Sequence, residues 1–367
     1  MKVGKLIRKA LKYSHTLERT CENFEDRRHL HAWNRTSSDL SWHLGPRAPF
    51  ALVEGSSHQL KNKIYIFGGY RSLDVVSQET LSLDLETEIW QKQAPLPEAA
   101  ANTHSGITSD GSEYIFLISG QRGGNCSPAT PNCLAFHTPS NTWSELPPLP
   151  EGRYMPMVHF FNGRIHCLSG TKPDRHTPAF EHWSLGVANG KPTDKKWRTE
   201  ANAPCPRTHT ASHLIGSYLY ILSGQIGDVA AISGSPDYIC DFSSFLEDFT
   251  CECYRLKLNS GEAIQLENSP ISLGHTENGV LQIGNKIFLA GGTTTNRNTL
   301  SDAILSYDTS TGKWAKVGRL PHPMKTMTAY WKGWLYSIEG QRYLSATHLR
   351  PGKMVGSVWK TLFTVTL

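Results

Sequence analysis

A short apolar strand that ends in glycine recurs six times in this chain of 367 residues, and few folds can accommodate such a repeat. The copies are IYIFGGY, YIFLISGQ, RIHCLSGT, YLYILSGQ, KIFLAGGT and WLYSIEGQ, with glycine at Gly69, Gly120, Gly170, Gly224, Gly292 and Gly340. Successive glycines are 51, 50, 54, 68 and 48 residues apart. A period near 50 residues with strand character throughout predicts a β-propeller with one four-stranded blade per repeat.

Other residues keep phase with the glycines. A tryptophan follows most copies after a strand and a tight turn, at Trp90, Trp143, Trp197 and Trp314, and a proline-rich loop comes next. We expect the glycines to allow backbone turns that a side chain would block, and the tryptophans to fill the space between neighbouring blades. These residues therefore make the fold rather than the function.

The two ends of the chain complement each other. The sixth unit ends with SVWKTLFTVTL and lacks its outermost tryptophan strand, whereas LSWHLGPRAPF near the start has that strand's pattern. Trp42 would then complete the last blade and remove an exposed sheet edge. We predict an all-β, six-bladed propeller over residues 39–367, closed by an N-terminal outer strand, with a basic segment 1–38 outside it.

Composition agrees with this fold class. The chain has 31 glycines, 21 prolines and 10 tryptophans, as expected of a protein with many turns and aromatic packing, and its net charge of +5 does not indicate nucleic-acid binding. The sequence contains no run of 18 apolar residues and therefore predicts no transmembrane helix. Residues 1–15 read as a short basic helix, either frayed in solvent or in peripheral contact with an acidic membrane surface.

The fourth unit departs from the others. It carries an insertion, IGDVAAISGSPDYICDFSSFLEDF, and NSGEAIQLE stands where a tryptophan strand is expected. Long loops on a rigid ring are tolerated and often determine binding specificity. Two disulfides are conceivable, Cys126 with Cys133, and Cys240 with either Cys251 or Cys253, whereas Cys167 reads as a small core residue.

Several stretches resemble one family more closely than the generic repeat requires. FGGYRSLD, NGRIHCLSGTKPDRHTPAFEHWS, GQIGDVAAISGSP and KTMTAYWKGWLYSIEGQR are similar to kelch-repeat proteins of the galactose oxidase-like superfamily, and most of all to plant kelch-repeat proteins of the Golgi and endomembrane system. The resemblance covers residue 38 to the end and implies a six-bladed propeller held in a secretory membrane by an N-terminal anchor. This chain has the basic stretch without a hydrophobic span, which leaves a cytoplasmic location open.

In kelch propellers, the loops after the glycines and the loops that enter the innermost strands open onto one face around the central channel. Those positions are rich in cationic and hydrogen-bonding side chains, which suit an anionic protein or glycan ligand. The alternative is that they are solvated loop residues inherited by every repeat. The predicted ligand-binding residues are Arg71, His104, Arg122, Arg153, Tyr154, Arg175, Arg207, His209, Gln225, His275, Lys325 and Arg342.

Two classes of function fit these residues. The first is a non-catalytic binding module for an unidentified protein or glycan, for which we expect a monomer without cofactor, metal or nucleic-acid partner. The second is a carbohydrate-active enzyme, epimerase- or lyase-like, acting on an acidic sugar with a histidine as proton carrier. The sequence has no nucleophile or phosphate-binding motif, and the spacing of Asp174, His176, Glu181 and His182 matches no standard metal site and favours salt bridging.

Overall fold

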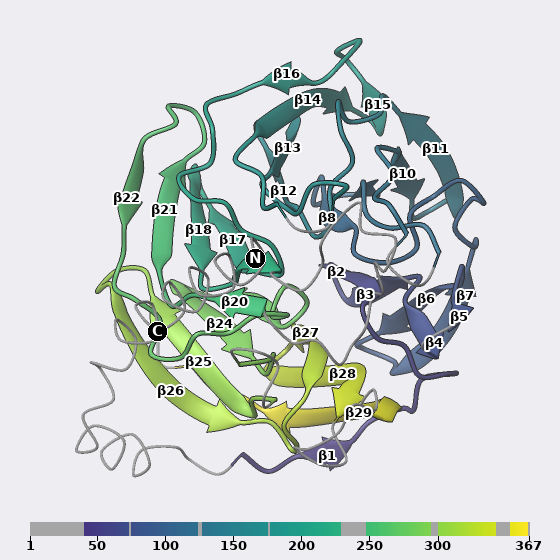
Figure 1. The fold of residues 1–367 in the computed structure, drawn as a ribbon. Coiled ribbons are helices and arrows are strands. Elements are labelled where there is room, and N and C mark those ends of the chain that lie inside the picture. Colours follow the sequence, from purple (N-terminus) through teal and green to yellow (C-terminus); the bar gives the residue numbers. More distant parts are fainter. Residues whose placement is uncertain are drawn as a thin grey trace, which may run out of the picture.

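The computed structural model describes residues 40–72, 75–123, 127–174, 177–228, 247–294, 300–342 and 353–365. Within them the chain is all-β, and Figure 1 shows its sheets arranged as blades around a central axis. The predicted six-bladed β-propeller is therefore confirmed. The predicted segment 1–38 lies outside the described residues. In the part of the chain that the structure describes, no helix is long and apolar enough to cross a membrane.

Each blade is an antiparallel sheet whose first strand lies nearest the axis. The first blade consists of β2 (Ser56–Leu60), β3 (Lys63–Phe67), β6 (Thr80–Asp84) and β7 (Ile89–Gln93). The second consists of β8 (Gly106–Ser109), β9 (Tyr114–Ile118), β10 (Cys133–His137) and β11 (Thr142–Leu146). The third consists of β12 (Met157–Phe161), β13 (Arg164–Leu168), β14 (His182–Ala188) and β16 (Arg198–Thr199), with β15 (Lys191–Pro192) also paired to β14.

The second half of the ring repeats this plan. The fourth blade consists of β17 (Ala211–Ile215), β18 (Tyr218–Leu222), β21 (Cys253–Lys257) and β22 (Ala263–Gln265). The fifth consists of β23 (Val280–Ile283), β24 (Lys286–Ala290), β25 (Ala303–Asp308) and β26 (Lys313–Arg319). The sixth combines β27 (Lys325–Trp331), β28 (Trp334–Arg342) and β29 (Lys353–Leu362) with β1 (His43–Leu44), which lies outermost.

The outer strand of the sixth blade comes from the opposite end of the described chain. His43 faces Lys360 and Leu44 faces Trp359 in antiparallel register. The Gly45 amide donates to the Val358 carbonyl at 2.8 Å. β29 therefore has a partner on both of its edges, and the ring is joined between its two ends.

The repeated glycine follows from backbone geometry. The repeated glycine has a positive φ in all six blades, from 80° at Gly170 to 119° at Gly340. A Cβ atom at Gly340 would lie 1.9 Å from the Lys325 carbonyl oxygen, and one at Gly69 would lie 2.9 Å from the Gly55 nitrogen. The chain thus turns against the entry to the innermost strand, where only glycine fits.

The tryptophans join neighbouring blades, as predicted. In five blades the indole Nε1 donates to a backbone carbonyl of the preceding blade. The five bonds are Trp42 to Arg319 at 2.9 Å, Trp90 to Pro46 at 2.9 Å, Trp143 to Ala94 at 3.1 Å, Trp197 to Pro147 at 2.8 Å and Trp314 to Glu267 at 3.1 Å. The register of β22 places Ala263 opposite Leu256, which is where the other blades have tryptophan.

In the fourth blade a two-stranded ribbon, β19 (Gln225–Asp228) paired with β20 (Glu247–Phe249), flanks the insertion on both sides. Residues 229–246 of the insertion lie outside the described residues. In the first blade a similar ribbon joins β4 (Tyr70–Ser72) and β5 (Val75–Val76). Both ribbons follow a glycine of the repeat. They therefore extend from the same face of the ring.

Two of the disulfide pairings that the sequence left open are wrong, because one cysteine of each is a free thiol. Cys133 is a free buried thiol, so the bridge to Cys126 considered above is wrong. Cys253 is also free, whereas Cys251 is disulfide-bonded to a partner outside the described residues. Cys167 is a buried free thiol in β13, as expected of a small core residue.

Candidate functional site

The candidate site begins with the residue that enters each innermost strand. Five blades place this residue in the left-handed region, with φ between 39° and 57°: Glu54, His104, Met155, His209 and His275. The shared backbone geometry gives these side chains a common direction. His104 and His209 belong to the second and fourth blades, which are not neighbours, and their ring centroids are nonetheless 5.5 Å apart. These side chains therefore meet near the axis of the ring.

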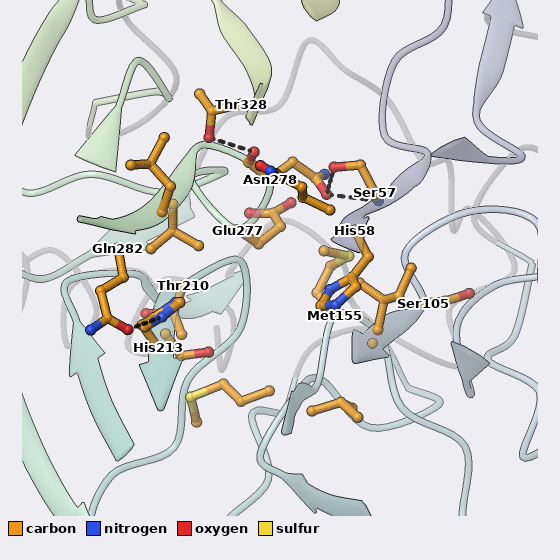
Figure 2. Close-up of a pocket in the computed structure, with 18 of the residues that line it drawn as sticks. Ser57, His58, Ser105, Met155, Thr210, His213, Glu277, Asn278, Gln282 and Thr328 are labelled. Atoms are coloured by element: carbon orange, nitrogen blue, oxygen red, sulfur yellow. Dashed lines mark hydrogen bonds between the residues drawn. The ribbon is translucent and has the colours of Figure 1, made fainter. Parts of the chain in front are cut away.

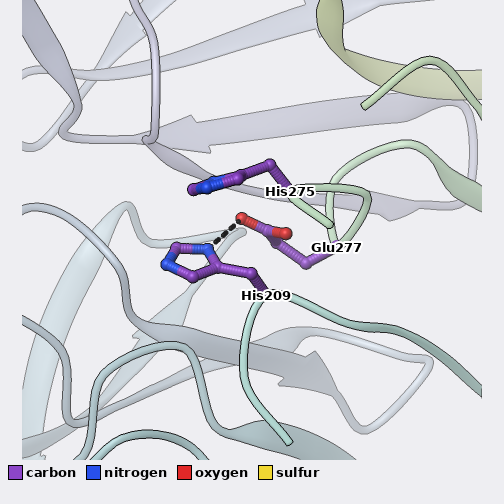
Figure 3. Close-up of side chains that lie close together, drawn as sticks. All are labelled: His209, His275 and Glu277. Carbon is purple, nitrogen blue, oxygen red and sulfur yellow. Dashed lines mark hydrogen bonds and ion pairs between the residues drawn. The ribbon is translucent and has the colours of Figure 1, made fainter. Parts of the chain in front are cut away.

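Three histidines and two carboxylates gather there, together with Lys325 of the sixth blade. We call Glu54, His104, His209, His275, Glu277 and Lys325 the channel-mouth cluster. The rings of His209 and His275 have centroids 4.0 Å apart, and Figure 3 shows Glu277 beside both of them. Tyr70 and Tyr154 pack against His104 in T-shaped arrangements, with ring centroids 6.2 and 6.1 Å from that of His104.

Glu54 links the cationic side chains of one half of the cluster. Its carboxylate accepts from Lys325 Nζ at 2.9 Å and lies 3.4 Å from His104 Nε2. Burial opposes the ionisation of Glu54, but Lys325 and His104 outweigh this effect and hold its pKa well below the ordinary value. The Lys325 charge is thus neutralised within the protein.

Glu277 plays the same part in the other half. Its Oε1 atom lies 3.1 Å from His209 Nδ1. Burial again opposes ionisation, but the charge and hydrogen bond of His209, with His275 nearby, lower the Glu277 pKa to about 2. Its second oxygen, Oε2, is buried and has no hydrogen-bond partner. The cluster therefore holds an ionised carboxylate with one free acceptor.

The innermost strands surround an open cavity of about 420 Å³, which Glu277 of the cluster also lines. Figure 2 shows Glu277 and Asn278 on one side of it and His58 and His213 on the others. Asn278 lies in the fifth blade, yet its side chain accepts from the Ser57 amide at 3.2 Å and donates to the Gly55 carbonyl at 3.1 Å in the first blade. The central channel is thus narrowed by side chains that connect blades across it.

Three histidines on the innermost strands each bond to the following blade. His58 Nε2 meets Ser109 Oγ at 2.8 Å, His159 Nε2 meets Ser212 Oγ at 2.9 Å, and His213 Nε2 meets Gln282 Oε1 at 3.0 Å. Burial lowers the pKa of His58 to about 4 and that of His159 to about 3, and it also lowers the pKa of His213. These imidazoles are neutral at pH 7 and act as hydrogen-bonding spacers.

Five of the predicted ligand-binding residues come together at or beside the mouth: His104, Tyr154, His209, His275 and Lys325. Gln225 is buried, and its backbone pairs with Thr208 at the entry to the fourth blade. Arg175 lies outside the described residues.

The predicted arginines are distributed differently. Arg153 is fully buried, donates to Glu181 at 3.1 Å and lies over the Trp183 ring at 4.5 Å. Arg207 donates to Glu252 at 3.0 Å. Both pack on the third strand of their own blade rather than toward the axis. The remaining three are at least partly exposed: Arg71 lies over the Phe50 ring at 4.4 Å, Arg122 lies 3.6 Å from Glu98, and Arg342 ends β28.

Sequence reasoning missed the two carboxylates of the cluster. Glu54 occupies the same place in its blade as His104, His209 and His275, so aligning all six entries would have found it. Glu277 lies two residues after His275 and carries no signal of that kind. Glu181, considered above in a possible metal cluster, instead pairs with Arg153 and Lys172, as the salt-bridge interpretation predicted.

Comparisons with known proteins agree with this architecture. A model described as the Kelch motif matches residues 276–321. A kelch repeat-containing protein of Arabidopsis thaliana is 34% identical over 329 residues, which cover 88% of this chain and 76% of that protein. Kelch-like protein 23 of Mus musculus is 22% identical over 291 residues, which cover 72% of this chain and 49% of that protein. Beta-scruin of Limulus polyphemus is 26% identical over 176 residues, which cover 44% of this chain and 18% of that protein.

The solved structure of YjhT is similar in three dimensions. Its TM-score is 0.65 at 13% sequence identity, and the match covers 86% of this chain and 96% of that one. At this identity the likeness concerns the fold alone.

Proposed function

Since this chain belongs to the kelch-repeat family, we propose that its propeller is a non-catalytic module that binds a protein or glycan ligand of anionic character on the loop face around the channel mouth. Kelch propellers typically bind proteins, which favours a protein over a glycan. The observation that carries the proposal is the filled channel mouth: His104, His209 and His275 are buried and in contact with carboxylates or with one another. A mouth closed by packed side chains favours contact with a broad surface over turnover of a small substrate.

Arg71 and Arg122 are the arginines we assign to the ligand. Both are exposed and follow directly after Tyr70 and Gln121, whose side chains are hydrogen-bonded to each other at 3.0 Å. Two neighbouring blades thus carry the two guanidinium groups. The contact of Arg122 with Glu98 is a surface pair, since the Glu98 side chain is 90% exposed, and such pairs contribute little. A carboxylate-bearing ligand can displace it at small cost.

The test measures binding of defined anionic probes to the full chain by calorimetry. The probes are a polyglutamate peptide, oligogalacturonate and sialyllactose, and a polylysine peptide is the negative control. We expect the acidic peptide to bind, and R71E with R122E to weaken that binding at least about tenfold, since charge-assisted bonds contribute roughly 1.5–3 kcal/mol each.

Arg198→Glu is the matched control, because Arg198 is an exposed arginine on the outer strand β16. It should leave affinity unchanged. Absence of binding by every anionic probe would overturn the anionic ligand. Equal binding by the double variant and the wild type would overturn the assigned face. Binding of the saccharides alone would shift the ligand from protein to glycan.

We also propose a location in the Golgi or endomembrane system, which the resemblance to plant relatives implies. Support comes from the disulfide at Cys251, because disulfides persist in oxidising compartments and are rare in the cytosol. Protease protection of the chain in isolated vesicles, released only by detergent, is the expected result. Digestion without detergent would contradict it.

A further inference from the structure

One part of the channel-mouth cluster has the composition of a metal site. His209, His275 and Glu277 each offer one ligand atom, and these atoms all lie within 4.8 Å of one another. They come from two adjacent blades, as Figure 3 shows. Both histidines are buried at positions of positive φ, where the rigid entry to an innermost strand orients the side chain. Two imidazoles and one carboxylate form a donor set that transition metals favour.

The charge of this set suits a divalent cation. Imidazole binds metals in its neutral form, so the net charge of the set is the single negative charge of the Glu277 carboxylate. The adjacent charges of Glu54 and Lys325 compensate each other at 2.9 Å. Glu277 Oε2 is buried without a hydrogen-bond partner, and such an acceptor is costly to bury unless something binds it. The His209–Glu277 contact by itself satisfies only Oε1.

We propose that His209, His275 and Glu277 bind one divalent transition-metal ion of the zinc class at the channel mouth. Two ligands about 2.1 Å from a tetrahedral zinc ion lie roughly 3.4 Å apart. Ligand atoms at the 4.8 Å limit must therefore close in by about 1.4 Å, whereas His209 Nδ1 and Glu277 Oε1 already lie 3.1 Å apart. Three protein ligands leave a fourth position for water or for a group of a binding partner. This site does not depend on the anionic ligand proposed above.

An ion can reach this set from the channel. Glu277 lines the cavity of about 420 Å³, together with Thr210 and Asn278, which directly follow His209 and Glu277 in the sequence. Glu277 therefore lines the cavity (Figure 2) and also lies beside the two buried imidazoles (Figure 3), neither of which lines the cavity. A hydrated ion that enters the cavity meets the charged ligand first.

The experiment titrates the full, untagged chain with Zn²⁺ after treatment with a chelator, and follows binding by calorimetry. We expect one Zn²⁺ per chain and no binding of Mg²⁺, which requires oxygen ligands. Co²⁺ in place of Zn²⁺ should give the visible absorption of a four-coordinate nitrogen and oxygen site.

The variants are Glu277→Gln and His275→Gln, which keep a polar side chain of similar size. Loss of one ligand should lower the affinity at least roughly 100-fold, because loss of an outer partner alone lowers it roughly 10–100-fold. His213→Gln is the control, since it removes a half-buried imidazole that lines the channel cavity and is not in the set.

Thermal unfolding without metal shows whether each variant folds. Zn²⁺ should raise the midpoint of the wild type and of His213→Gln, and leave that of the two ligand variants unchanged. If Zn²⁺ fails to bind the wild type, or binds equally well to both ligand variants, the set is only a structural ion pair and the proposal is overturned.

Discussion

At the scale of single residues, the position directly before the repeated glycine shows how one side chain can destabilise the fold. All six copies of this position have positive φ, and three of them are serine. Ser119 Oγ donates to the Thr130 carbonyl and accepts from the Arg153 amide, and Ser223 Oγ makes the equivalent bonds to Thr250 and Leu273. Glu339 takes this place in the sixth blade, where it is fully buried and neither of its oxygens has a hydrogen-bond partner.

Glu339→Ser is therefore expected to stabilise the protein by about 1–3 kcal/mol near neutral pH, the usual penalty of an unsatisfied buried polar group. Burial raises the Glu339 pKa well above its ordinary value of 4.5. The folded state keeps its proton where the unfolded state has lost it, so the wild type loses stability as pH rises above 4.5, by up to about 1.4 kcal/mol per pH unit. The variant should lack this decline.

Urea unfolding at pH 5 and pH 8 measures both effects. Glu262→Ser, at an exposed position before β22, is the control and should follow the wild type. An equal pH dependence in wild type and Glu339→Ser would show that the carboxyl does not titrate as its burial implies.

At the scale of elements, the outer strands connect each blade to its predecessor through an indole. β22 is the exception among the described blades, because Ala263 stands in place of the tryptophan. In the other blades the acceptor usually lies four residues after the preceding tryptophan, which makes Ala201 the corresponding acceptor here. The Ala201 carbonyl already accepts from His182 Nδ1 at 3.0 Å, but a carbonyl oxygen has two lone pairs.

Ala263→Trp is expected to raise the stability of the propeller by about 1–2 kcal/mol, because the indole buries apolar area and reaches a free lone pair. The midpoint of urea unfolding measures the gain. Ile264→Trp is the matched control, since the adjacent residue of a strand faces the opposite side of the sheet. A gain no larger than that of the control would mean that the two blades cannot close around an indole here.

At the scale of the whole molecule, the ring depends on a strand supplied from the other end of the described chain. β1 contributes the outer edge of the sixth blade, and the Trp42 indole reaches Arg319 of the fifth. Without β1, β29 would expose an unpaired edge, which promotes association between chains.

We expect a chain that begins at residue 46 to lose about 3 kcal/mol or more of stability, the usual cost of removing a packed tryptophan, and to associate at high concentration. Thermal unfolding and light scattering measure the two effects. A chain that begins at residue 40 is the control and should unfold like the full chain, in line with our proposal that residues 1–38 lie outside the propeller. A monomeric chain of full stability after loss of β1 would contradict the role of this strand.

Much of the fold could be predicted from the sequence, because its determinants are local and repeat with the blade. Glycine marks a left-handed turn against another backbone, and tryptophan marks an outer strand that packs on the preceding blade. Each unit therefore contains the residues that determine the structure of its blade, and six such units predict the ring. In the fourth blade, the sequence shows where the tryptophan is missing and where the insertion lies, but the structural consequences of both could not be derived from it.

The channel-mouth cluster depended on tertiary structure. The sequence identified His104, His209 and His275 as facing the channel, but not that Glu54 and Glu277 neutralise the charges around them. Arg153 and Arg207 show the same dependence, because Glu181 and Glu252 hold them on their own blades. The sequence alone determined the number and construction of the blades, since these follow from backbone conformation and repeated packing. Only the closed ring decided which charges are paired, because it brings residues of different blades within bonding distance at the axis.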